Sequence, residues 1–318
     1  MSLDPIPLDP KLQALAEIGR YLQRNNYNFI TVTPQTHQYY LQRHQERLAT
    51  QLRDMFGWCL PFESKLLDAE LWRWMQQADC IEKHTLGWRS KVRWSSLGDA
   101  LFVHSGYPTD EQDAVFFGPD TYRFTRAIDD FLRGNREDIR TVADIGCGSG
   151  AGAAYLASRL PDADISAVDI NPRALDYTAV NLRIANIRNV TTYSSNLLDS
   201  VDGCFDLIVA NPPYMSDSLT RAYRHGGAHK GAELSLAIVD TAMQRLAAGG
   251  TLVLYTGVAI VDGEDVFLTE LQHRVQNWHC RWDYYEVDVD VFGEELLQDT
   301  YQDVERIAAV VLTLRKLG

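Results

Sequence analysis

The residues with the strongest chemical character form a short motif, Asn-Pro-Pro-Tyr at residues 211–214, which follows an apolar segment ending at Ala210. Two prolines restrict the backbone at this point. They hold the amide oxygen of Asn211 and the carbonyl oxygen of Pro212 as hydrogen-bond acceptors. An amino group on a planar carbon offers two N–H donors to such a pair, and the ring of Tyr214 can stack on the planar group. Taken alone, the motif is also compatible with an ordinary turn, which is the alternative.

A glycine-rich segment, Asp-Ile-Gly-Cys-Gly-Ser-Gly at residues 144–150, follows an apolar strand pattern and opens a helical one. Glycines allow a sharp turn and let backbone amides approach a ligand. Their recurrence at every second position does not fit a pyrophosphate-binding loop, and it favours a nucleoside without phosphates. Asp169 lies 19 residues after Gly150, where the next predicted strand ends. Its carboxylate can accept hydrogen bonds from both ribose hydroxyls, although a capping role is the alternative.

The second half of the chain alternates strand and helix patterns, which favours a doubly wound, mainly parallel α/β sheet. We expect strands at residues 141–145, 165–169, 190–194, 205–210, 251–255, 284–289 and 306–314, and helices at 151–159, 172–185, 235–246 and 264–276. Asn171 is the expected cap of the second of these helices, with Pro172 in its first turn. Since the carboxyl ends of the strands form the ligand crevice of such a sheet, the three motifs are expected to meet there.

The first half predicts a smaller, mainly helical domain over residues 1–112 that carries a β-hairpin. Helical patterns cover residues 10–25, 35–56 and 68–78, and residues 88–95 and 100–105 flank a turn. Such a module is similar to a winged helix, and it would either recognise a substrate or cap the site. The second domain is then expected over residues 113–318.

Together, residues 144–150, Asp169 and residues 211–214 resemble motifs I, II and IV of class I S-adenosylmethionine-dependent methyltransferases of the N-P-P-Y group. That group includes release-factor glutamine, N6-adenine and ribosomal RNA guanine-N2 methyltransferases. The resemblance covers roughly residues 113–318. It implies a Rossmann-like seven-stranded sheet with an antiparallel last strand, S-adenosylmethionine as cofactor, S-adenosylhomocysteine as product, and no metal.

The resemblance also implies which residues form the site. Those expected at the cofactor are Asp144, Gly146, Cys147, Gly148, Gly150, Asp169, Ile170, Asn196, Leu197 and Asn211. Those expected to be catalytic are Asn211, Pro212 and Tyr214. Relatives often carry aspartate at the position of Asn196, but its side chain can still accept a hydrogen bond from the adenine amino group.

Two segments are expected on the substrate side. Phe117 and Thr121 belong to a segment that resembles the one bordering the site in release-factor methyltransferases. Arg221, Arg224 and His225 lie in a glycine-containing stretch that could close over a substrate. A solvated surface loop is the alternative for that stretch.

Charge gives opposing indications about the substrate. The net charge is −13, and residues 113–318 hold 18 Lys and Arg against 30 Asp and Glu. Residues 286–305 contain eight acidic residues and no Lys or Arg. If residues 284–289 run parallel to the first strands, this segment leaves from the catalytic face, where it would repel phosphates and favour a cationic or polypeptide substrate. Conversely, five basic residues surround Trp88 and Trp94, as in some RNA-binding surfaces. A solvated helix face and a half-buried hairpin are the respective alternatives.

Composition limits the class of protein. No apolar run reaches the roughly 18 residues of a membrane span, the first residues do not resemble a signal peptide, and the five cysteines include no C-x-x-C pair. We therefore expect a cytoplasmic protein with reduced thiols, no membrane partner and no cysteine-based zinc site.

The predicted function is methyl transfer to a planar nitrogen of a macromolecule, either a glutamine amide of a protein or an exocyclic amine of an RNA base. The motifs leave these two substrates open. One alternative is N-methylation of a small metabolite, with the first domain as a lid. An alternative of another class is a non-catalytic binding module that keeps the scaffold. The sequence makes no prediction about the oligomeric state.

Overall fold

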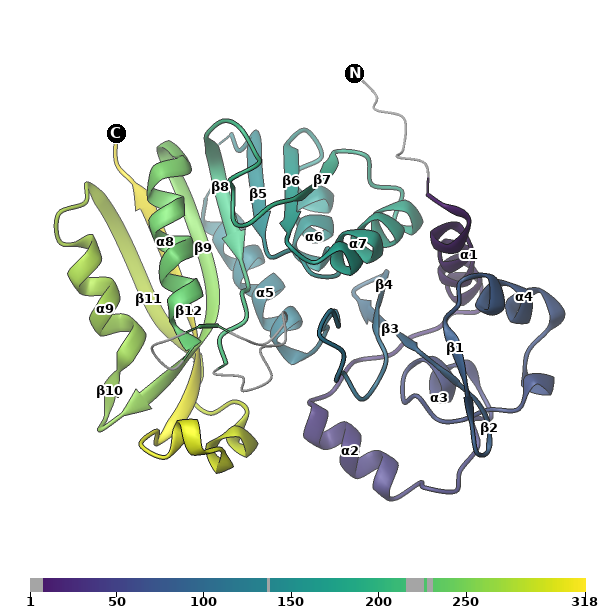
Figure 1. Ribbon diagram of the computed structural model, residues 1–318. Coiled ribbons are helices and arrows are strands. Elements are labelled where there is room, and N and C mark those ends of the chain that lie inside the picture. Colours follow the sequence, from purple (N-terminus) through teal and green to yellow (C-terminus); the bar gives the residue numbers. More distant parts are fainter. Residues whose placement is uncertain (1–7, 136–137, 216–225, 228–230) are drawn as a thin grey trace.

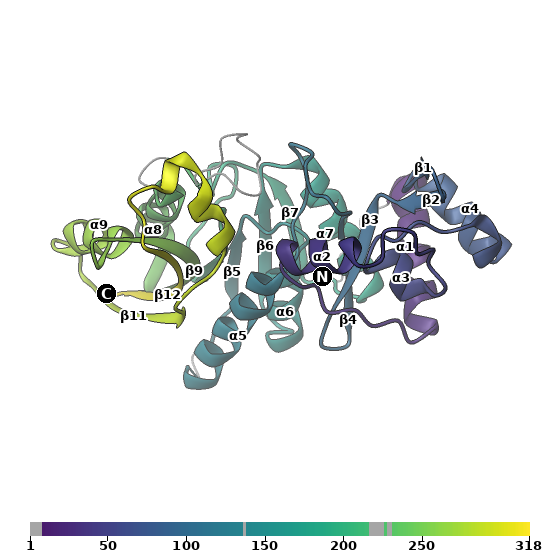
Figure 2. The ribbon, with the colours of Figure 1, turned by 90° about the horizontal axis from the view of Figure 1, so that it is seen from below.

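The computed structural model describes residues 8–135, 138–215, 226–227 and 231–318. Its main body is a sheet with helices on both faces, and a smaller part with its own helices and hairpins lies beyond one edge of that sheet (Figure 1). The second view shows the same arrangement, with β11 at one end of the molecule and the smaller part at the other (Figure 2). None of the described helices is both long and apolar enough to cross a membrane.

The strand order of the main sheet is β11-β12-β9-β8-β5-β6-β7. The strands are β5 (Thr141–Ile145), β6 (Asp164–Asp169), β7 (Val190–Ser194), β8 (Phe205–Ala210), β9 (Leu246–Val261), β11 (Cys280–Asp288) and β12 (Arg306–Lys316), and a short β10 (Glu264–Asp265) pairs with β9. The five strands β9, β8, β5, β6 and β7 are parallel to one another. Strand β12 is antiparallel to both of its neighbours, β9 and β11. The expected doubly wound sheet with an antiparallel last strand is confirmed.

Alternating burial along the strands explains the two helical layers, because successive side chains of a strand point to opposite faces. In β8, Leu207 and Val209 join the core beneath α5 (Pro119–Gly134) and α6 (Ala151–Arg159). Ile208 and Ala210 join the core beneath α8 (Glu233–Arg245) and α9 (Val266–Val275). A strand segment buried on both faces carries apolar residues at successive positions, as residues 207–210 of β8 do.

Helix α7 (Pro172–Ile184) connects the main body to the smaller part. It begins as expected, with the side chain of Asn171 accepting a hydrogen bond from the Arg173 N–H at 3.0 Å and with Pro172 in the first turn. Its Val180 and Ile184 belong to the apolar core of the smaller part. The helix is therefore shared by both parts of the molecule.

The smaller part contains four helices and two hairpins among the described residues. They are α1 (Pro10–Arg24), α2 (Pro34–Gln42), α3 (Leu52–Phe56), α4 (Ala69–Gln77), β1 (Ile81–His84), β2 (Gly87–Ser90), β3 (Val92–Leu97) and β4 (Ala100–Ser105), with a 3₁₀ turn η1 (Ser64–Leu66). The predicted hairpin is present as β3 and β4, whose turn contains Gly98 at φ +57°. The first residues of the expected strand 88–95 instead form β2, which pairs with β1.

The expectation of one helix over residues 35–56 was wrong. The chain leaves the helical path after α2 and resumes it only at α3. The carboxylate of Asp54 accepts hydrogen bonds from the backbone N–H and the hydroxyl of Thr50, at 3.0 and 3.1 Å, and the N–H of Ala49 bonds to the carbonyl of Pro61. These bonds satisfy backbone groups outside a helix, which a 3.6-residue pattern cannot reveal.

Candidate active site

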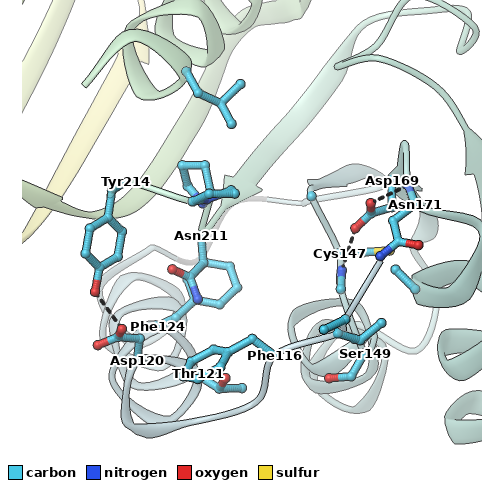
Figure 3. A pocket seen from close by; sticks show the side chains of 18 of the residues that line it. Phe116, Asp120, Thr121, Phe124, Cys147, Ser149, Asp169, Asn171, Asn211 and Tyr214 are labelled. Atoms are coloured by element: carbon cyan, nitrogen blue, oxygen red, sulfur yellow. Dashed lines mark hydrogen bonds between the residues drawn. The ribbon is translucent and has the colours of Figure 1, made fainter. Parts of the chain in front are cut away.

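A cavity of about 330 Å³ opens at the carboxyl ends of β5, β6 and β8, where the three motifs meet (Figure 3). Its walls are the loops after these strands, the first turns of α5, and residues 107–116, which connect the smaller part to α5. In the close view, Asp169 and Tyr214 lie at opposite ends and Asn211 lies between them (Figure 3). The cavity lies at the position expected for the ligand crevice of a doubly wound sheet.

The glycine loop lines this cavity with exposed backbone. Gly146 and Gly148 have φ values of +71° and +56°, which are strained for other residues, and a Cβ on either would meet no atom within 4 Å. A ligand can therefore approach the backbone closely here. At Gly150, which has φ +76° and precedes α6, a Cβ would instead lie 2.7 Å from the side chain of Thr178.

Asp169 binds the loop to the start of α7. One carboxylate oxygen accepts the N–H of Gly148 and the other accepts the N–H of Asn171, both at 2.9 Å. Burial raises the pKa of this carboxyl, and the backbone hydrogen bonds oppose the increase. Each oxygen retains a lone pair for a ligand hydroxyl. The geometry is compatible with the expected role at a ribose.

Asp144 is almost fully buried at the end of β5. Its carboxylate accepts the N–H of Ala153 at 2.8 Å, so it braces the first turn of α6. Burial raises the pKa of Asp144 to about 7, and the charge of Asp169 adds to the increase. A Cβ at Gly152 would lie 2.7 Å from this carboxylate, which explains why a glycine stands there.

The remaining residues expected at the cofactor also line the cavity. They are Cys147, Ile170, Asn196 and Leu197. Leu197 has φ +48°, in the left-handed region, and Ile170 is 61% exposed. An exposed apolar side chain beside a cavity offers a surface for a flat ligand group. These placements fit the predicted roles, which remain predictions.

The Asn-Pro-Pro-Tyr motif lies at the opposite wall. Asn211 and Pro212 line the cavity directly. Tyr214 also lines it, but its side chain is buried and its hydroxyl donates a 2.6 Å hydrogen bond to Asp120 (Figure 3). The ring lies against the backbone of Gly257, where a Cβ would be 2.2 Å from it. Tyr214 is thus fixed in the wall of the cavity, and its expected role as a ring on which a planar group stacks remains a prediction.

The substrate-side expectations have mixed outcomes. Thr121 lines the cavity, and its hydroxyl accepts the Gly118 N–H at the start of α5. Phe117 was misplaced: it is fully buried and stacks on Phe102 and His104, while the preceding Phe116 lines the cavity. Arg221, Arg224 and His225 lie outside the described residues.

Sequence reasoning missed Asp120, whose buried carboxylate lines the cavity and accepts the hydroxyls of Tyr214 and Tyr255. It also missed the contribution of residues 107–110 of the connecting segment. The sequence did offer one indication of a role for Asp120 at the site: it follows Pro119 in the same segment that contains Phe117 and Thr121. Tyr255 gave no signal, because its position in an apolar strand predicts only core packing.

The described lining of the cavity is acidic. It includes Asp110, Asp120, Asp144, Asp169, Glu294 and Glu295, and no described lining residue is Lys, Arg or His. The two glutamates belong to the 3₁₀ segment η3 (Gly293–Leu297), which is followed by η4 (Asp299–Tyr301). Because β11 runs in the same direction as the parallel strands, the acidic segment after it leaves from the cavity side, as expected.

The basic residues of the first hairpins are largely engaged within the protein. Lys91 pairs with Asp79 at 3.1 Å, and Arg89 pairs with Glu82. Arg93 is buried and donates to the carbonyl of Ser105. Trp94 is fully buried in the core. This arrangement of Arg89, Lys91, Arg93 and Trp94 fits the alternative of a half-buried hairpin.

Comparison with known proteins agrees with this geometry. A family model described as Methyltransferase small domain matches residues 130–260. Residues 130–260 are thus similar to the domain of that methyltransferase family. Release factor glutamine methyltransferase of Rhodopirellula baltica is 34% identical to the chain over 154 residues, which cover 43% of this chain and 51% of that protein. Ribosomal RNA small subunit methyltransferase C of Klebsiella pneumoniae is 32% identical over 111 residues, which cover 35% and 29% respectively.

The chain thus spans about half or less of the length of these relatives. Among solved structures, a ribosomal protein L11 methylase from Lactobacillus delbrueckii subsp. bulgaricus is similar, with a TM-score of 0.42 and 21% identity over 61% of this chain and 80% of that one. The segment matched by the family model, residues 130–260, includes the glycine loop, Asp169 and the Asn-Pro-Pro-Tyr motif. It does not include the part of α5 before residue 130 or the acidic segment after β11.

The residues that line the cavity fit S-adenosylmethionine. The backbone at Gly146 and Gly148 faces open space, which a Cβ atom on either residue would partly occupy. Asp169 presents carboxylate oxygens beside it. The cavity is of the size at which small-ligand sites begin, roughly 300 Å³. No cluster of three or more His, Cys, Asp or Glu side chains suited to a metal occurs among the residues that the structure describes.

Proposed function

We propose that this chain is an S-adenosylmethionine-dependent N-methyltransferase whose acceptor is a side-chain amide of a polypeptide. The observation that carries the proposal is that Asn211 and Pro212 line the same cavity as the glycine loop and Asp169. The acceptor pair and the nucleoside site therefore share one enclosed space, as transfer between two ligands requires.

The roles of the residues follow from their placement. S-adenosylmethionine supplies a methyl group on a sulfonium sulfur, which is open to in-line displacement. The glycine loop and Asp169 hold the cofactor. The oxygens of Asn211 and Pro212 accept the two N–H bonds of the acceptor amide and direct its nitrogen lone pair out of the amide plane. Positioning and hydrogen bonding supply the catalysis, with no strong base needed.

The polypeptide acceptor is favoured by the charge of the cavity. Six acidic side chains and no basic one line it within the described part of the chain. A nucleic acid would bring phosphates toward these carboxylates at a cost in Coulomb energy. A side-chain amide brings no charge. One of the relatives with similar sequence carries release factor glutamine in its name, and this favours the same class of acceptor.

We further propose that residues 1–112 recognise the substrate or cap the site, and that the protein acts in the cytoplasm. Residues 107–110 of the first part already form a wall of the cavity. The five cysteines are all free, as is typical of proteins in a reducing compartment.

The test uses S-adenosylmethionine labelled on its methyl group, the pure full chain, and an extract of cells that lack the gene. Protein, RNA, DNA and small molecules are separated afterwards. We expect label in the protein fraction, resistant to nuclease and located on a side-chain amide. Label confined to RNA or to small molecules would replace the polypeptide acceptor, and a pure chain that fails to bind S-adenosylmethionine would favour a binding module.

The variant Asn211→Ala tests the acceptor pair in the same assay. We expect cofactor affinity to stay within about twofold and turnover to fall by about 100-fold or more, because one of the two acceptors is removed. Asn135→Ala, which removes an amide at the far end of α5, is the matched control. Wild-type turnover in Asn211→Ala would show that this amide does not orient the acceptor.

A further inference from the structure

Asp120 occupies an unusual position for a carboxylate. It lies in the first turn of α5, only 4% exposed, and it lines the cavity. Tyr214 donates to one of its oxygens at 2.6 Å, and Tyr255 donates to the other at 2.7 Å. Arg123, one turn later in α5, donates to it at 3.1 Å. The N-terminus of a helix also favours a negative charge.

The hydrogen bond to Asp120 is one of three contacts that fix the ring of Tyr214. One side of the ring packs so closely against the backbone of Gly257 that residue 257 has no room for a Cβ atom. Phe292 meets the ring edge to face, with centroids 6.0 Å apart. Asp120 holds the hydroxyl end. Because the Tyr214 ring is hydrogen-bonded at its hydroxyl and packed against Gly257 and Phe292, it restricts the backbone that carries it.

Tyr214 can serve this purpose because it remains a donor. Burial, reinforced by the negative charge of Asp120, raises the pKa of the Tyr214 phenol well above its ordinary value. The hydroxyl therefore keeps its proton at physiological pH. Hydrogen bonds between a neutral donor and a charged acceptor are about twice as strong as neutral ones.

The same carboxylate is linked to the opposite wall. Arg123 also pairs with Asp288 at 2.7 Å, and Asp288 ends β11. The chain that follows brings Phe292 against Tyr214. A hydrogen bond and two ion pairs thus connect the tyrosine of the motif, the start of α5 and the acidic segment, three regions far apart in sequence.

We propose that Asp120 is a positioning residue that acts through Tyr214 to hold Asn211 and Pro212 in their productive orientation. This inference rests on the proposed function for its effect on turnover, but its effect on the backbone is independent of it. Asn211 is anchored on one side by β8 and on the other, three residues later, by the clamped ring of Tyr214. Releasing that ring frees the motif at one end.

The experiment is a double-mutant cycle with Asp120→Asn, Tyr214→Phe and the two combined. Asp120→Asn keeps the shape of the side chain but puts an NH₂ group where one tyrosine donates. Tyr214→Phe removes the hydroxyl that donates to Asp120 and keeps the ring. It therefore tests the same hydrogen bond if Asp120→Asn does not fold. We expect each single variant to lower turnover by about tenfold or more, with the dissociation constant for S-adenosylmethionine unchanged. The double variant should be no worse than the worse single one.

A second readout uses the protein without cofactor. Hydrogen exchange is followed at the backbone amides of Asn211, Tyr214 and Met215, with the amides of β12 as an internal reference for global opening. We expect faster exchange at the motif in both single variants, no further increase in the double variant, and no change in β12. Asp130→Asn, at an exposed carboxylate of the same helix that pairs with Arg126, is the matched control.

The outcomes separate the two proposals. Faster exchange at the motif together with a non-additive loss of turnover supports the role of Asp120. Additive losses, or unchanged exchange in Asp120→Asn and Tyr214→Phe, would overturn it. If the wild type methylates no polypeptide, the proposed function fails, and the exchange data still decide whether Asp120 holds the motif.

Discussion

Asp144 and Asp169 end adjacent parallel strands, and burial raises the pKa of both carboxyl groups. Their partners differ. Both line the cavity, but Asp169 accepts the backbone N–H groups of Gly148 and Asn171, whereas Asp144 accepts the N–H of Ala153 and braces the first turn of α6. At the residue scale, the same type of side chain therefore joins the glycine loop to α7 at one position and supports α6 at the other.

The ribose assignment predicts the effect of Asp169→Asn. The amide can accept only one of the two backbone N–H groups and carries no charge for ligand hydroxyls. We expect the dissociation constant for S-adenosylmethionine, measured by calorimetry, to increase by about 10- to 100-fold. Asp164→Asn, at the exposed beginning of the same strand, should leave it unchanged. Equal affinity in Asp169→Asn and the wild type would exclude the assignment.

The raised pKa of Asp144 predicts a pH dependence of stability. The carboxyl titrates near 3.8 in the unfolded chain and near 7 in the folded one. The folded state therefore binds the extra proton, and its stabilising contribution, complete below about pH 4, is lost as the pH rises to about 7. The variant Asp144→Asn does not lose stability in this way as the pH rises, because its side chain is always neutral and still accepts the Ala153 N–H.

Urea unfolding without cofactor, at several values between pH 4.5 and 7.5, measures this effect. We expect the free energy of unfolding of Asp144→Asn, relative to the wild type, to rise with pH by at most about 4 kcal/mol. A difference that stays constant across this window would show that Asp144 is ionised in the folded protein throughout.

At the scale of elements, α7 holds the site together. Asn181 is buried in its last turn, accepts the Val103 N–H at 2.8 Å, and donates to the carbonyls of Ser149 and Val103 at 2.8 and 3.2 Å. Thr178 donates to the carbonyl of Gly148 at 3.0 Å. One helix thus fixes the glycine loop from behind and binds the hairpin of the smaller part on its other side.

This arrangement predicts that Asn181→Leu is strongly destabilising. The substitution conserves volume but leaves three buried backbone groups without their partner. We expect the free energy of unfolding in urea to fall by about 2–4 kcal/mol and the affinity for S-adenosylmethionine to fall with it. Asp176→Leu, on the exposed side of the same helix, should change stability by no more than about 0.5 kcal/mol. Similar stabilities for the two variants would contradict the role given to Asn181.

At the scale of the whole molecule, the distribution of charge favours a partner without phosphates. The chain carries a net charge of −13, the described lining of the cavity is acidic, and Arg89, Lys91 and Arg93 of the first hairpins are paired or buried. Binding to nucleic acid without sequence preference depends on Lys and Arg that neutralise phosphates.

We therefore expect the full chain to bind structured RNA with a dissociation constant weaker than about 10 μM at 0.15 M salt. Filter binding over a salt series measures this, and a basic RNA-binding protein serves as the positive control. Tighter binding, with a salt dependence that indicates several phosphate contacts, would shift the proposed acceptor from polypeptide to RNA.

The sequence alone predicted the parts that depend on local pattern. Alternating strands and helices, with glycines and an acidic residue at strand ends, indicated the doubly wound sheet and the edge where Asp169 and Asn211 would meet, whereas its antiparallel last strand was implied by the resemblance to a known family. These signals are local, because a strand buried on both faces and a cap such as Asn171 are specified by neighbouring residues.

Tertiary structure decided which side chains face the cavity. Whether Phe116 or Phe117 points inward is a matter of one residue, and in extended backbone that step reverses the face. The break between α2 and α3 depends on a bond from Ala49 to Pro61. Asp120 meets Tyr214 across 94 residues and Tyr255 across 135. Nothing in the local sequence encodes such contacts, since they exist only when the sheet brings distant strand ends beside one helix.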